Sequence, residues 1–165
     1  MSFLRKFSDI VDKIMTVLAT ISLFGFVIVM LIQVFQRNFT PAHAWSFADS
    51  LCRHFFIWAT FTGAAMVSKR RKQISITLIP DILKGFPKKA LTIFNYLLVI
   101  VILAFAIYWG GYSTIVNISQ NMDTVPYPAA VVYAAIPIGM AATCIQEIIN
   151  MIVDLDSWRK EGKSA

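Results

Sequence analysis

The chain has 165 residues, of which 58% are hydrophobic and 15% are charged, and its formal net charge is +6. Soluble domains carry about 25% charged residues, so this composition and the mean hydropathy of +0.67 exclude an ordinary soluble protein and indicate an integral membrane protein. The excess of Lys and Arg does not indicate nucleic-acid binding, because these residues flank apolar stretches instead of following one polar face.

The first apolar stretch predicts a membrane span over residues 14–36. Residues 2–13 alternate apolar and charged side chains at helical spacing, which is typical of a segment that lies in the interface and leads into the bilayer. The 23 residues that follow carry no charge. At about 1.5 Å per residue they cross a hydrocarbon core of about 30 Å.

The second span is predicted over residues 46–68, and its start has two readings. Thr40 caps the helix with Pro41 in the first turn, or Ser46 caps it and forms a capping box with Asp49. We prefer the later start, after an irregular or tilted entry at residues 40–45.

Two features of this helix are candidate structural or partner-contact positions. Trp45, Asp49 and Arg53 are spaced four residues apart and share a face, with the acid before the base, which favours an ion pair. Ala59 and Gly63 have the small-xxx-small spacing that lets another backbone approach closely. Their face is therefore predicted to pack against protein.

A cluster of four cations follows the second span and determines the topology, because basic residues in short loops stay in the cytoplasm. The predicted cytoplasmic loop covers residues 69–89, and Pro80 and Gly85 frame a short helix on the membrane surface. The topology-determining cations are Lys69, Arg70, Arg71 and Lys72.

The third span is predicted over residues 90–116. No charge occurs from Ala90 to Met122, which is long enough to require a tilted or protruding helix. Aromatic residues near its end mark the external interface. These are Tyr108, Trp109 and Tyr112.

The fourth span is predicted over residues 129–153, after an external loop at 117–123 and an opening at Pro126–Pro128. Pro137 removes a backbone donor and releases the carbonyl of Tyr133, which predicts a kink. Residues 154–165 form a cytoplasmic tail, which we expect to be disordered beyond Trp158.

The distribution of Lys and Arg gives the orientation. Residues 1–13 hold three, 37–53 two, 69–89 seven, 113–128 none, and the tail three, which is thirteen against two. The prediction is an all-α integral membrane protein with one domain over residues 1–165, four transmembrane helices, short interfacial helices and both termini in the cytoplasm.

Few charged residues fall within the predicted spans, which argues against a protein that transports alone. Asp49 and Arg53 lie near the external end of the second span and form a structural pair or contact a partner. Glu147 lies near the internal end of the fourth span, where we expect headgroup water or a loop lysine to reach it.

The sequence predicts no enzyme, cofactor site or metal site. His43 and His54 are eleven residues apart and have no opposed histidine in another span, which excludes a haem pair. Cys52 and Cys144 stand alone, without the paired external cysteines of a thiol oxidase.

Nearly the whole chain resembles the small, DctQ-like membrane subunit of tripartite ATP-independent periplasmic (TRAP) transporters. Asp49 stands where family members usually carry glutamate, and Gln73 where a histidine is common. The residues that carry the resemblance are Arg37, Trp45, Ser46, Asp49, Arg53, Trp58, Phe61, Gly63, Ala64, Ile74, Ile76, Tyr133, Pro137, Ile138 and Gly139.

The resemblance implies an accessory role in the bacterial inner membrane. In such systems a large, DctM-like membrane subunit carries substrate and sodium by an elevator motion, a soluble periplasmic protein delivers the ligand, and the small subunit braces the scaffold. Substrates across the family are mostly organic acids, including dicarboxylates and sialic acid. The expected partners are those two proteins and membrane lipid, with no nucleic acid, and the candidate interface residues are Arg37, Trp45, Asp49, Arg53, Ala59, Gly63 and Pro137.

Two other functions are considered as alternatives on the basis of the sequence. A self-sufficient four-helix exporter would carry a membrane-embedded carboxylate in its first helix, and this chain has none between Asp12 and Asp49. An orphan membrane assembly factor would differ by not copurifying with a transporter.

The first testable prediction concerns the orientation. In a Cys52→Ala, Cys144→Ala background, Arg71→Cys resists an impermeant thiol reagent in intact cells and Asn121→Cys reacts, because the basic loop stays inside. Labelling at position 71 from outside would reverse the whole topology.

Overall fold

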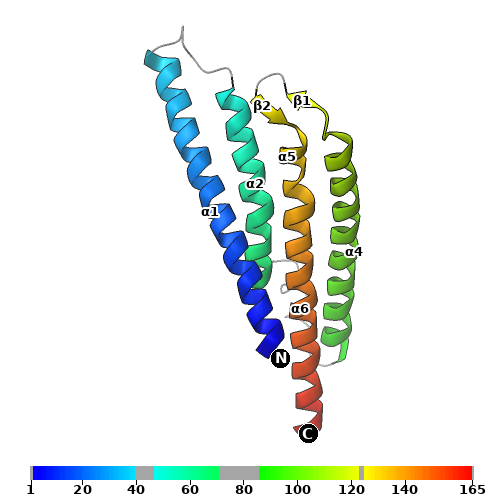
Figure 1. The fold of residues 1–165 in the computed structure, drawn as a ribbon. Helices are drawn as coiled ribbons and strands as arrows, with labels where there is room; N and C mark the ends of the chain where they lie inside the picture. Colours follow the sequence, from blue (N-terminus) through cyan, green and yellow to red (C-terminus); the bar gives the residue numbers. More distant parts are fainter. Residues whose placement is uncertain (1, 40–46, 71–85, 123–124, 165) are drawn as a thin grey trace.

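The computed structural model describes residues 2–39, 47–70, 86–122 and 125–164. These residues form long helices and one small β-hairpin (Figure 1). The elements in chain order are α1 (Ser2–Phe39), α2 (Ala48–Lys69), α4 (Phe86–Val116), β1 (Asn121–Met122), β2 (Val125–Pro128), α5 (Ala130–Tyr133) and α6 (Ala135–Ser164).

Helix α1 is continuous from Ser2 to Phe39, so residues 2–13 and the predicted first span belong to one helix, and the interfacial position of residues 2–13 stays a prediction. Neither proline nor glycine occurs at the junction between Lys13 and Ile14. Without a residue that breaks the backbone hydrogen bonds there, the first segment continues directly into the long apolar helix.

Helix α2 begins at Ala48, with Phe47 as its N-cap and no side-chain capping bond. The predicted capping box with Ser46 as the N-cap is therefore wrong. The alternative start at Thr40 and the indole of Trp45 lie outside the described residues. The same holds for Arg71, Lys72 and the surface helix expected between Pro80 and Gly85.

Helix α4 starts earlier than the predicted span and ends at the predicted residue, Val116. Pro87 occupies its first turn, where the missing N–H has no intrahelical partner to lose. Gly110 lets α4 approach α6 closely, because a Cβ at this position would lie 2.8 Å from Cγ2 of Ile136.

The hairpin β1–β2 was not predicted. Asn121 pairs with Pro128 and Met122 with Val125, in antiparallel register. Residues 117–123 are thus not simply an irregular loop, and Pro126–Pro128 belongs to a strand instead of opening a helix. A two-stranded ribbon tolerates its prolines because each strand has an unpaired edge.

The last helix is interrupted at Ala134, which separates α5 from α6 one turn before Pro137. Pro137 has no N–H for the carbonyl of Tyr133, so the regular bond is missing there. Beyond the break α6 continues to Ser164. The expectation of a disordered tail is wrong, and the Asp156–Lys160 ion pair at 2.9 Å supports this last part of the helix.

The helices stand in an open row instead of a closed bundle. The order across the row is α1, α2, α5/α6, α4 (Figure 1), and the N-terminal part of α1 also contacts α6. Within the described residues, α1 and α4 share no substantial packing. Both edge helices expose large apolar side chains, including Phe24 at 65% and Phe105 at 66%.

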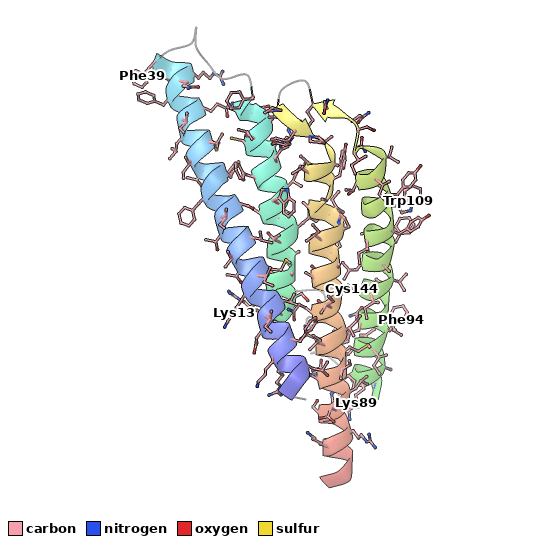
Figure 2. The ribbon with its side chains drawn as sticks, viewed as in Figure 1. Lys13, Phe39, Lys89, Phe94, Trp109 and Cys144 are labelled. Atoms are coloured by element: carbon pink, nitrogen blue, oxygen red, sulfur yellow. The ribbon has the colours of Figure 1, made fainter. Side chains whose placement is uncertain are left out.

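Among the described residues, three helices are long and apolar enough to cross a membrane: Leu4–Phe39, Pro87–Val116 and Ala130–Lys160. Helix α2 is not among them, since it carries Arg53, His54 and several hydroxyls within its 22 residues. Four spans therefore remain a prediction. The two chain ends lie at one end of the row and the hairpin at the other (Figure 1), while aromatic side chains such as Trp109 project outward from α4 (Figure 2).

The second testable prediction concerns the close approach of α6 to α2. A Cβ at Gly139 would lie 2.5 Å from the carbonyl oxygen of Phe61, so Gly139→Ala should lower the free energy of unfolding by roughly 1–3 kcal/mol through overpacking. The matched control is Gly111→Ala, where a Cβ meets nothing within 4 Å. Thermal unfolding in mild detergent measures both, and equal melting temperatures would contradict this close contact.

Candidate functional site

Five polar side chains meet at the end of the row that holds the chain termini, and we call this group the polar clamp. Ser8 comes from α1, Ser68 from α2, and Gln146, Glu147 and Asn150 from α6. Ser8 Oγ donates to Gln146 Oε1 at 2.6 Å, and Gln146 Nε2 donates to the Ser8 carbonyl at 3.0 Å. Ser68 Oγ donates to Glu147 Oε1 at 2.7 Å, and Asn150 Nδ2 donates to the Ser68 carbonyl at 3.0 Å.

The clamp is almost completely closed to solvent. Ser68, Gln146 and Glu147 are each 1% exposed. A polar group in such surroundings is costly unless it finds a hydrogen-bond partner inside the protein. The bonds of the clamp can form only when three helices stand in one register, so they hold α1, α2 and α6 together.

An ion pair lies beside the clamp. The ammonium of Lys69, in the last turn of α2, donates to the Asp9 carboxylate on α1. Lys69 is only 22% exposed at its side chain, whereas Arg70, the next cation of the basic cluster, is exposed. The two described members of the predicted basic cluster therefore differ, since Lys69 links two helices and Arg70 does not.

A second polar contact connects the hairpin to α2 at the opposite end of the row. The Tyr127 hydroxyl lies 2.5 Å from His54 Nδ1, and Trp58 Nε1 donates to the Val131 carbonyl at 3.1 Å. Burial raises the pKa of Tyr127, which favours its protonated phenol. These bonds border an apolar cavity of about 140 Å³, which Leu51, Phe55 and Val132 also line.

Asp49 and Arg53 form the ion pair that their spacing predicts, with 3.5 Å between Oδ2 and Nη2. Both side chains are 72% exposed. Exposed pairs contribute little to stability, so this pair leaves two charged groups on an open surface. Arg37 is also exposed, in the last turn of α1, where a cation is favourable beside the helix C-terminus.

The small-residue pair on α2 does not pack inside this chain. A Cβ at Gly63 would meet nothing within 4 Å, and Ala59 is half-buried. The described close approaches occur instead at Gly139 against α2, at Gly25 of α1 against Phe55 of α2, and at Gly110 beside Pro137, whose Cδ lies 3.1 Å from the ideal Cβ position. Among the predicted site residues with described side chains, only Asp49 and Arg53 are brought into an ion pair with each other.

Neither the clamp nor the burial of Glu147 was predicted from the sequence. At 1% exposure this carboxylate is out of reach of headgroup water, so that part of the expectation is wrong, and Lys72 and Lys84 of the loop lie outside the described residues. The sequence signal for the clamp is a group of three polar residues within five positions that follows the apolar stretch of α6. These residues are Gln146, Glu147 and Asn150. Polar groups in that setting require internal partners.

Metal-ligating side chains do not gather in the part of the chain that the structure describes. No three His, Cys, Asp or Glu side chains there lie close enough together to hold a metal ion. Cys52 is buried, with its thiol 3.7 Å from Gln33 Oε1. Both cysteines are free thiols.

Comparison with known proteins gives one family. The family model described as "Tripartite ATP-independent periplasmic transporters, DctQ component" matches residues 26–157, which extend from within α1 to the last part of α6. No curated protein matches the chain.

The third testable prediction concerns the polar clamp. Ser68→Ala removes the hydroxyl that donates to Glu147 and should cost about 1–3 kcal/mol of unfolding free energy, because the carboxylate remains buried. Ser157→Ala is the control, since its exposed hydroxyl bonds only a carbonyl of its own helix. The two variants are compared by chemical denaturation in detergent, and equal stability would show that the clamp contributes nothing measurable.

Proposed function

The chain belongs to the family of DctQ components of tripartite ATP-independent periplasmic transporters, and from this membership we propose that it is the small membrane subunit of a sodium-driven transporter for organic acids. In this proposal it braces the large, DctM-like subunit in the bacterial inner membrane. A periplasmic binding protein delivers the substrate, such as sialic acid or a C4-dicarboxylate. Sodium coupling belongs to the large subunit.

The observation that carries the proposal is the family match over residues 26–157, because this family is a transporter component. The matched part includes all of α2, α4 and the hairpin. The geometry is compatible with a scaffold, since contacts between neighbouring helices hold the row together from end to end.

The positions of the charged groups support an accessory role. A charged substrate that crosses the hydrocarbon core needs groups that replace its water. In the described part of the chain, Asp49 and Arg53 are exposed near one end of α2, and Glu147 bonds Ser68 within the clamp. Among these residues, the middle of the row has no set of charged groups that could replace the water around an anion or a sodium ion.

The open row supports an extended contact with another membrane protein. Both edge helices expose large apolar side chains, and a Cβ at Gly63 would meet nothing within 4 Å in the described chain. Small residues permit close approach of a foreign helix. We therefore propose the small-residue surface at Ala59 and Gly63 as a contact with the large subunit, and the exposed Asp49–Arg53 pair as a contact at its external end.

The proposal also includes the orientation of the chain in the membrane. The end with the chain termini, Lys69 and Arg70 faces the cytoplasm, and the hairpin end faces the periplasm, in agreement with the excess of basic residues. The hairpin then lies on the side from which the binding protein approaches.

The fourth testable prediction is that the chain transports nothing by itself. In liposomes with an inward sodium gradient, the purified chain should take up no sialic acid or C4-dicarboxylate above empty vesicles. Uptake should appear when the large subunit and the binding protein encoded with it are added, because the moving substrate site is theirs.

Two controls make this assay decisive. The large subunit with the binding protein, but without this chain, should give reduced uptake if the chain braces it. Sodium-driven uptake by the chain alone would refute the accessory role, and failure to copurify with the large subunit would favour an assembly factor.

A further inference from the structure

A cavity of about 270 Å³ lies between α1, α2 and α6, directly beside the polar clamp. Three charged side chains line it: Arg5 and Asp9 from α1, and Lys69 from α2. Ser8 and Asn150, two buried members of the clamp, contribute to its wall. The cavity thus combines flexible charges with polar groups that the clamp holds in place.

The charges of the cavity are unbalanced. Lys69 donates to Asp9, but an ammonium has three donors, so this bond leaves others available. Arg5 offers five donors and forms no ion pair with the described residues. Two cations face one carboxylate that is already bonded, so the cavity favours an anion.

The rest of the lining indicates that the anion belongs to an amphipathic molecule. Ile149 and Val153 complete the wall on α6 and give the cavity an apolar side. A small inorganic anion gains nothing from apolar neighbours, whereas acyl chains do. Basic pockets between membrane helices on the cytoplasmic side are suited to phospholipid headgroups.

We propose that this cavity binds the phosphodiester of a membrane phospholipid, with Arg5 and Lys69 as its cationic contacts. A phosphodiester presents acceptor oxygens to both cations. The acyl chains lie against Ile149 and Val153 of α6, the apolar residues of the cavity wall.

Asp9 adds a preference among headgroups. Its carboxylate accepts hydrogen bonds, so it suits a headgroup that carries a donor beside the phosphate. The ammonium of phosphatidylethanolamine and the hydroxyls of phosphatidylglycerol are such donors. The quaternary ammonium of phosphatidylcholine has no N–H and should bind more weakly.

The inference goes beyond the scaffold role and is tested on the full chain alone. The delipidated protein in detergent is titrated with phosphatidylglycerol, and the rise in melting temperature gives an apparent affinity. Arg5→Gln should weaken this affinity about fivefold, the effect expected for one cation near an anionic lipid. Lys6→Gln is the control, because Lys6 is an exposed neighbour that does not line the cavity, and it should leave the affinity unchanged.

A second variant tests the cavity without changing a charge. Val153→Phe fills the space beside the cations, so saturable stabilisation by phosphatidylglycerol should disappear. Phosphatidylcholine should stabilise the wild-type chain less, and inorganic phosphate at equal concentration should not stabilise it.

Three results would overturn the proposal. Equal affinities of the Arg5→Gln and Lys6→Gln variants for phosphatidylglycerol would show that Arg5 does not contact the lipid. This comparison tests the proposal even if the Val153→Phe variant does not fold. Undiminished binding by a folded Val153→Phe protein would place the lipid elsewhere. Equal stabilisation by inorganic phosphate would identify a site for the free anion instead of a lipid.

Discussion

The structure depends on one constraint, which is that a polar atom buried among apolar helices must find its hydrogen-bond partner within the protein. The polar clamp supplies such partners at one end of α2, where Ser68 Oγ donates to Glu147 Oε1, and the Tyr127–His54 contact supplies one at the hairpin end of α2. Between these ends the backbones come closest at Gly139. Helix α2 is therefore held to α6 by the clamp and by close packing at Gly139, and to the hairpin and α5 by polar bonds at its other end. Helices α1 and α4 attach to either side of the α2–α6 pair.

The long helices could be predicted from the sequence because uncharged stretches bounded by charges leave few alternatives. The end of α4 at Val116 and the Asp49–Arg53 pair follow from local spacing alone. The clamp could not be predicted in this way, since Ser8 and Gln146 are 138 positions apart and only the packing of α1 against α6 brings them together. The hairpin was missed because Pro126 and Pro128 argue against a strand by propensity, although a two-stranded ribbon can accept them.

The glycines also show how far the packing of the helices can be predicted from the sequence. The spacing of Ala59 and Gly63 indicates a surface that permits close approach, but it does not say which chain approaches. A Cβ at Gly63 would meet nothing within 4 Å, whereas Gly139, which has the same spacing from Ala135 and Thr143, packs against α2 of this chain. A small-residue pattern thus identifies a surface that permits the close approach of another helix, and the three-dimensional structure is needed to identify that helix.

The open row of helices has a mechanical consequence. A closed four-helix bundle resists bending equally in all directions around its axis, whereas a single layer is stiff in its own plane and compliant across it. The length and width of such a layer stay fixed, while its curvature can change to match the surface of a neighbouring protein. The shape of a neighbour with a curved flank can therefore be followed by small rotations of α4 against α6, while the clamp keeps α1, α2 and α6 in register.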